Sequence, residues 1–204
     1  MKSSDLQDSD LDGLREIGNI GAGNAATALS QLLREVVTLE VPEVRTLELR
    51  DLPASLGGPD RVLVAVHLRI LGDLRGDLLL TLPTAGAASL LRRMGLEAPD
   101  LHELPPLAES ALREVGQILS STYLNAVSHV LERNLVPSVP GLAVDFAGAV
   151  VDLLPIQLAG ISERALVLET AFRESGGPIR GHFFLVPDPE GIHLLLRGVR
   201  RRHG

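Results

Sequence analysis

A segment near the start of the chain recurs 98 residues later, and this internal repeat limits the possible folds more than any other feature. Residues 12–42 align with residues 110–140 without a gap. Ten of the 31 aligned positions are identical, namely Leu14/Leu112, Arg15/Arg113, Glu16/Glu114, Gly18/Gly116, Ile20/Ile118, Ala28/Ala126, Ser30/Ser128, Leu33/Leu131, Val41/Val139 and Pro42/Pro140. The repeat predicts a chain of two similar halves related by an internal two-fold.

Helical spacing places the polar residues of each copy on one face. In the first copy, steps of three or four residues join Asp12, Glu16, Asn19, Gly23, Ala26 and Ser30. Leu14 and Ile17 fall on the opposite, apolar side. The second copy repeats the polar face with Ser110, Glu114, Gln117, Ser121, Leu124 and Ser128. We therefore expect a carboxylate and a carboxamide to point outward from each of two helices.

Composition narrows the class of protein. With 204 residues, 45% apolar and 22% charged, the chain is long enough for a globular core. A net charge of −7 and the scarcity of aromatic side chains argue against binding of nucleic acid. The chain has no cysteine, which excludes disulfides and thiolate metal sites. Neither a signal peptide nor an apolar run long enough to span a membrane is present, so we expect a cytoplasmic location and no membrane insertion.

The pattern of elements predicts one α/β domain of the α+β type over residues 1–204, with halves at about 11–98 and 106–200. Each half is expected to contain a long helix, three strands and a shorter helix. Short turns between the strands predict a largely antiparallel sheet with the helices packed on one side. The expected helices are 11–35, 84–94, 106–134 and 188–199, and the expected strands are 36–49, 62–71, 75–82, 142–154, 164–172 and 179–186, with a turn at 52–60.

Glycines inside the first helix need an explanation, because each costs roughly 1 kcal/mol relative to alanine. Close packing of the buried side explains Gly18 and Gly21, whereas Gly23 lies on the polar face, where it would let another protein's backbone approach. A competing interpretation takes residues 21–26 as the G-x-G-x-x-A motif of dinucleotide-binding folds. That motif must follow a strand and open a helix, but here a helical pattern precedes it, so we disfavour it.

Several other residues carry weaker signals. Asp12 and Ser110 are expected to begin or stabilise their helices, with contact to a partner as the alternative. The six histidines show no metal-ligand spacing, which favours structural or surface roles. Residues 200–203 form a basic tail, which is either a solvated terminus or a match for a groove on an acidic partner.

The spacing of the repeated residues resembles the signature of the CheC family of chemotaxis phosphatases. In that family, Asp or Ser is followed after three residues by Glu, after two more by Asn, and after a further 22 by Pro. The first copy matches at Asp12, Glu16, Asn19 and Pro42. In the second copy the matching residues are Ser110, Glu114, Gln117 and Pro140, with Gln117 in place of the expected asparagine.

This resemblance implies an aspartyl-phosphate phosphatase that hydrolyses the phosphoaspartate of the response regulator CheY. It implies catalytic roles for Glu16 and Asn19, and for Glu114 and Gln117 at the second site. Glu16 would accept a salt bridge from a lysine of the regulator, and Asn19 would hold the attacking water. No cofactor is expected on this chain, because the regulator would carry the Mg²⁺. The resemblance also implies the deamidase CheD as a further partner.

Because glutamine is longer than asparagine by one methylene, we expect the two sites to be unequal. The alternative is a binding module that docks a response regulator or regulates CheD with little or no catalysis.

Overall fold

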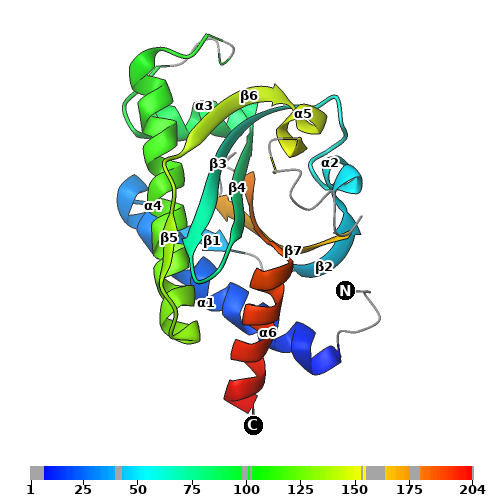
Figure 1. Ribbon diagram of the computed structural model, residues 1–204. Coiled ribbons are helices and arrows are strands. Elements are labelled where there is room, and N and C mark those ends of the chain that lie inside the picture. Colours follow the sequence, from blue (N-terminus) through cyan, green and yellow to red (C-terminus); the bar gives the residue numbers. More distant parts are fainter. Residues whose placement is uncertain are drawn as a thin grey trace.

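The computed structural model describes residues 7–39, 43–97, 101, 103–152, 154, 164–174 and 180–203. It shows two successive halves whose helices and strands follow in the same order, apart from a short 3-10 helix in the first (Figure 1). The first half contains α1 (Asp8–Leu33), β1 (Val37–Leu39), β2 (Glu43–Glu48), the short 3-10 helix η2 (Leu49–Asp51), α2 (Leu52–Ser55), β3 (Val62–Gly72), β4 (Gly76–Pro83) and α3 (Thr84–Arg93). The second half contains α4 (Pro106–Leu131), β5 (Leu135–Pro137), β6 (Gly141–Phe146), α5 (Ala147–Val151), β7 (Arg164–Glu174), β8 (Arg180–Pro187) and α6 (Pro189–His203).

All strand pairs form one eight-stranded antiparallel sheet in the order β1-β7-β8-β4-β3-β5, with β2 also paired to β7 and β6 also paired to β3. The two halves therefore exchange strands. β1 and β2 of the first half lie on β7 of the second, and β5 and β6 of the second half lie on β3 of the first. This exchange interlocks the halves.

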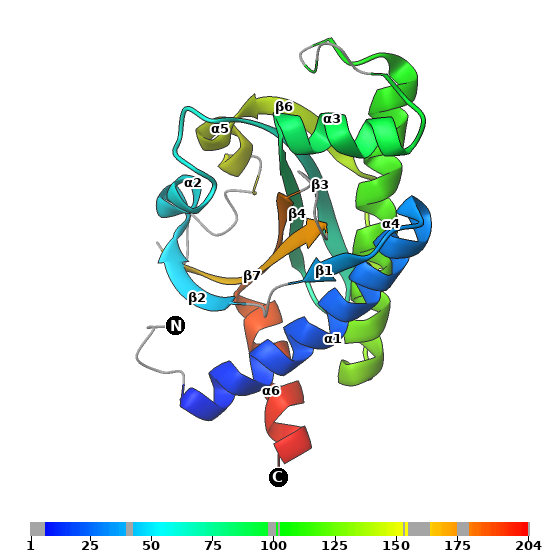
Figure 2. The same ribbon diagram turned by 180° about the vertical axis from the view of Figure 1, so that it is seen from behind.

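Alternation along the strands gives the sheet two apolar faces. Val64 and Val66 point into a large core that contains residues of α1, α3, α4 and α6, whereas Leu63 and Ala65 point into a smaller core with α2 and α5. The four longer helices thus cover one face of the sheet (Figures 1 and 2). The expectation of helices on one side is correct for these four and wrong for α2 and α5.

Several expected boundaries are wrong. The strand expected at 36–49 is split into β1 and β2, and the turn expected at 52–60 begins with α2. The strand expected at 142–154 ends at Phe146, where α5 begins. Ala147, Val150 and Val151 lie on one side of α5 and are buried in the smaller core, so tertiary burial overrides the strand preference of the valines. With β5, each half has four strands rather than three.

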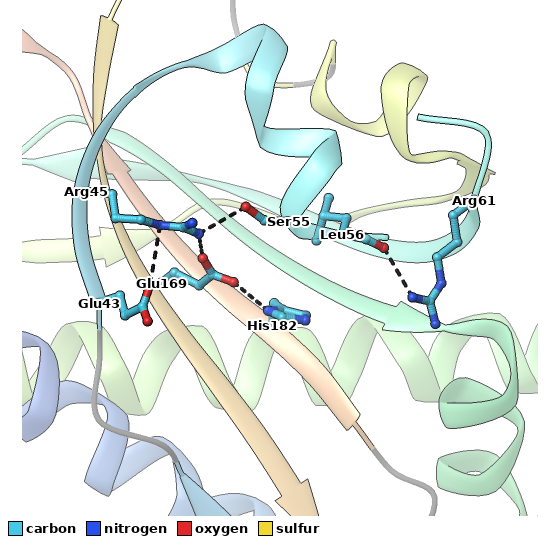
Figure 3. A network of polar contacts seen from close by, with 7 residues as sticks. All are labelled: Glu43, Arg45, Ser55, Leu56, Arg61, Glu169 and His182. Carbon is cyan, nitrogen blue, oxygen red and sulfur yellow. Dashed lines mark hydrogen bonds and ion pairs between the residues drawn. The ribbon is translucent and has the colours of Figure 1, made fainter. Parts of the chain in front are cut away.

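An ion-pair network holds an exchanged strand in register (Figure 3). Arg45 of β2 pairs with Glu169 of β7, and its guanidinium donates to the Ser55 hydroxyl at 3.1 Å. Glu169 also lies 2.6 Å from the His182 ring on β8. A shift of β2 by one residue would turn Arg45 to the other face of the sheet and leave the buried Glu169 without this cation.

His67 of β3 makes a similar contact with Asp77 of β4, at 2.7 Å. Both strand histidines therefore bind carboxylates within the sheet. No set of three or more His, Asp or Glu residues in the described ranges is arranged to hold a metal ion. No helix in those ranges is both long enough and apolar enough to cross a membrane.

Candidate active site

The repeated helices begin in different ways and end in matching ways, and neither Asp12 nor Ser110 caps them. α1 begins at Asp8, where the Asp10 carboxylate accepts a hydrogen bond from the Gln7 backbone N–H at 3.2 Å. α4 begins with a proline at its first helical position, which needs no amide hydrogen. Asp12 and Ser110 do not begin the helices, because both lie at the fifth helical position, and their roles in stabilising the helices or contacting a partner stay predictions. Asp12 instead accepts a hydrogen bond from Arg15 at 2.8 Å.

At their C-termini both helices end on a residue in the left-handed conformation, Arg34 and Glu132, each with a φ of 55°. The amide of each donates to the carbonyl of the repeated serine, Ser30 or Ser128. The Ser30 hydroxyl also accepts a hydrogen bond from Val37 at the start of β1, at 3.0 Å. The Ser128 hydroxyl donates to the Arg133 carbonyl, so both repeated serine side chains bond the segment just after their helix.

Packing fixes which side of each helix faces outward. Tyr123 of α4 lies over Gly21 of α1, where an added Cβ would be 2.7 Å from the tyrosine ring. In α4, a Cβ on Gly116 would be 2.4 Å from a methyl of Val66 in the sheet. Leu14 and Ile17 are fully buried beside Gly18. Close packing at Gly21 is thus confirmed, and it keeps α1 from rotating about its axis.

The acid and amide of α1 lie on the exposed side that this packing leaves. Glu16 and Asn19 are both exposed, and one turn further on nothing lies within 4 Å of the position of a Cβ on Gly23. In the described part of the chain no group hydrogen-bonds the Asn19 carboxamide. This face can therefore receive another protein's surface at close range, with the amide available to a bound water.

The corresponding face of α4 is more closed. Glu114 is exposed, but Gln117 is half-buried and its carboxamide donates to the Ser121 hydroxyl at 3.1 Å. Leu124, expected on this face, is buried in the large core. The prediction that Leu124 lies on the outer face is therefore wrong, because neighbours cover α4 on more than one side.

One motif proline also has a defined contact. Arg113, next to Glu114, donates to the Pro140 carbonyl at 2.7 Å and pairs with Glu109 on its own helix. This contact joins the loop between β5 and β6 to α4 beside the second acid. Pro42, the matching residue of the first copy, lies outside the described residues. The identical Arg15/Arg113 pair is the signal in the sequence for this contact.

Among the identical exposed positions of the repeat, Glu16 and Glu114 have no role in the core. Leu14/Leu112, Gly18/Gly116 and Leu33/Leu131 are buried, so packing accounts for them. An exposed acid repeated at the same place on both helices points to a role at the surface. Residues 21–26 lie in the middle of α1, so the dinucleotide-binding interpretation is excluded.

The architecture defines a class of two-fold-duplicated α/β proteins with two long helices packed on an antiparallel sheet. A solved structure of this class is described as the X-ray crystal structure of Thermotoga maritima FliY. It superposes on the chain with a TM-score of 0.75 at 21% identity and covers 97% of this chain and 98% of that one. At this level of identity the match shows the fold.

Sequence comparison gives the family. The model of the CheC-like family matches residues 11–45. The chain is 33% identical over 196 residues to the CheY-P phosphatase CheC of Bacillus subtilis, with 94% of both chains covered. It is 25% identical to the putative CheY-P phosphatase CheC1 of Halobacterium salinarum, with 93% and 95% covered. The chain belongs to the CheC family, as the spacing of its repeated residues predicted.

Proposed function

We propose that the chain is a phosphatase of a chemotaxis response regulator and that the exposed face of α1 is its principal active site. The observation that supports this most is the arrangement of Glu16 and Asn19 beside the open position at Gly23, on a helix whose rotation is fixed by the Tyr123 contact. The relative from Bacillus subtilis is named as acting on CheY-P, which supports a phosphorylated CheY as the substrate here.

The proposed reaction is hydrolysis of an acyl phosphate. A water oxygen attacks the phosphorus, the bond from phosphorus to the aspartate oxygen breaks, and the products are the free aspartate carboxylate and inorganic phosphate. Such transfers depend on position and on charge neutralisation more than on covalent help from the catalyst. The Asn19 carboxamide suits this role, because its oxygen accepts a hydrogen bond from the water and its NH₂ group donates to a phosphate oxygen.

Glu16 is proposed to anchor the complex. One turn before Asn19 on the same face, its carboxylate can pair with a cation of the regulator next to the acyl phosphate, such as a lysine. This pair would set the distance between the amide and the phosphorus. An error of about 1 Å in that distance can reduce the rate on the order of 100-fold, so a rigid helix is a suitable support.

The metal ion is proposed to come with the substrate. Mg²⁺ requires octahedral oxygen coordination and is commonly held by carboxylates together with phosphate oxygens. The α1 face offers two acids, Asp12, which pairs with Arg15, and Glu16, together with a neutral amide, so the regulator's own carboxylates and phosphate would provide most of the coordination. CheD is proposed as a further partner, and this proposal rests on the family resemblance alone.

A second candidate function, docking without catalysis, is favoured by one observation on α4. The hydrogen bond to Ser121 uses one N–H of the Gln117 amide, so the carboxamide on this face is held by its own helix, unlike that of Asn19. We propose that α4 binds the regulator weakly or hydrolyses its phosphate slowly, while α1 supplies most of the activity.

The test is the lifetime of a response regulator phosphorylated with a small-molecule phosphodonor. With the wild-type chain present, we expect phosphate release to accelerate. The control is the double variant Asn19→Ala/Gln117→Ala, which retains both acids and should bind the regulator without accelerating release. Binding of the wild-type chain with an unchanged lifetime would establish a docking module and refute the proposed phosphatase.

A further inference from the structure

A cleft between the end of α4 and the middle of α6 has an excess of positive charge. Its volume is about 430 Å³, and it is lined by Arg133, Leu194, Arg197, Arg200 and Arg201. All four arginines are exposed, although the chain as a whole has a net charge of −7. The cleft is therefore a local exception in an acidic protein.

The contacts of these arginines leave most of their hydrogen-bond donors unused. Arg200 binds the carboxylate of Asp10 on α1 through two nitrogens, both at 2.9 Å. Arg201 makes one contact, to the Leu131 carbonyl, and Arg133 makes one, to the Glu132 carbonyl. Within the described part of the chain, Arg197 has neither a hydrogen bond nor an ion pair. Each guanidinium has five N–H donors. The bonds from Arg201 and Arg133 to carbonyls at the end of α4 therefore use only a small part of the donors available.

The internal repeat shows what the cleft lacks. α4 follows α1 at an offset of 98 residues, so Arg133 corresponds to Glu35 of the first half. β8 follows β4 at an offset of 104 residues, and at that offset Arg197 corresponds to Arg93. In the first half, Glu35 and Arg93 form an ion pair. In the second half, an arginine replaces the acid, so both positions are cationic.

We propose that this cleft binds an acidic segment of a partner protein, with a carboxylate of that segment taking the place that Glu35 fills in the first half. Guanidinium groups bind carboxylates through two parallel hydrogen bonds, and Arg133 and Arg197 approach the cleft from different elements. Leu194, half-buried on the cleft wall, provides an apolar contact for a neighbouring side chain of the segment.

The carboxylate, rather than a phosphate, is favoured because the corresponding position of the first half holds a glutamate. None of the residues that line the cleft belongs to the face of Glu16 and Asn19, and the proposal does not depend on the phosphatase activity. Both the ligand and the readout of the test differ from those of the active site.

Direct binding of an acidic peptide tests the proposal. The probe is a fluorescein-labelled peptide of ten glutamates, and its fluorescence anisotropy is measured with the wild-type chain at low ionic strength. Binding should weaken as salt is added, because exposed charges are screened. A labelled Gly-Ser peptide of equal length is the neutral control.

Two charge reversals identify the site. Arg133→Glu and Arg197→Glu each recreate within the chain the acid–arginine pair of the first half, so each should fold and should bind the peptide at least about tenfold more weakly. Arg92→Glu, at an exposed position of α3, makes the same change in net charge away from the cleft and should stay within about twofold of wild type. Circular dichroism and thermal melting check the fold of all three.

Three results would overturn the proposal. The first is peptide binding no tighter than that of the neutral control. The second is an equal loss in Arg133→Glu and Arg92→Glu, which would show a response to net charge alone. The third is displacement of the peptide by inorganic phosphate or ATP at lower concentrations than by free glutamate peptide, which would make the ligand a phosphate compound.

Discussion

Shortening the amide of the second site should increase its activity. The two sites already share the three-residue spacing from acid to amide, and Gln117→Asn makes the amide itself the same as Asn19, on a helix of the same length. The change withdraws the carboxamide by one methylene and removes its hydrogen bond to Ser121. To isolate the second site, the substitution is made in an Asn19→Ala background.

The expected gain follows from two terms. Displacement of a catalytic group by about 1 Å costs on the order of 100-fold in rate. The hydrogen bond to Ser121, which the amide must break before it can bind water, adds about 0.5–1.5 kcal/mol, or about twofold to tenfold. Allowing for Ser121 in place of the open Gly23, we expect the residual activity of Asn19→Ala to rise about tenfold to 100-fold. In the wild-type background the total should change by no more than about twofold, because α1 already supplies most of the rate.

The assay is single-turnover decay of the regulator's phosphoaspartate, with the chain in excess over the regulator. Asn19→Ala alone and Asn19→Ala/Gln117→Asn are compared at matched concentrations. An unchanged or lower rate in the double variant would refute the argument that side-chain length limits the second site. Restoration by Ser121→Gly alone would place the limit in access to the helix instead.

Three further predictions concern the helices that carry the sites. Gly21→Ala should lower the free energy of unfolding by about 1 kcal/mol or more, because the clash with the buried Tyr123 ring exceeds the gain in helix propensity. Gly23→Ala, where the added methyl meets open space, should raise the free energy of unfolding by up to about 1 kcal/mol. Urea unfolding of the two variants measures both changes. Gly23→Leu should slow regulator dephosphorylation while leaving the melting temperature close to wild type, and unchanged turnover would show that no partner backbone approaches there. Hydrogen bonds from Arg200 and from the Gln7 amide lower the pKa of Asp10, against the opposing effect of burial. The ionised carboxylate therefore stabilises the fold fully at a pH above 3.8, its ordinary pKa, and this contribution is lost as the pH falls below that value through the lowered pKa of the folded state. Asp10→Asn should therefore melt below wild type at pH 7, and the difference should disappear in acid; a constant difference across that range would contradict the assignment.

Local patterns predicted the features that depend on nearby residues. The two long helices, the strands β3, β4, β7 and β8, and the outward face of Glu16 and Asn19 all follow from periodicity. The exchange of β1 and β2 onto β7 could not be predicted, because it pairs residues more than 100 positions apart. For the same reason, the basic tail gave no indication that Arg200 binds Asp10.

Within the site, spacing predicted which residues share a face but not how exposed each one is. Gln117 was recognised as different by its length, whereas its bond to Ser121 depends on a side-chain conformation that spacing does not determine. Leu124 satisfied the helical pattern and is nevertheless buried, because α1 and the sheet pack on α4 together. The prediction of a strand at 142–154 is wrong from Ala147 onward, because burial there favours the short helix α5 over the strand preference of the valines.

The most direct test of the central claim compares Asn19→Ala with Gln117→Ala in the phosphoaspartate decay assay. If the α1 face is the principal active site, Asn19→Ala reduces the accelerated decay to about 1% of wild type, the level left by a second site about 100-fold slower. Gln117→Ala then stays close to the wild-type rate. Equal losses from the two substitutions, or full activity in Asn19→Ala, would contradict the assignment.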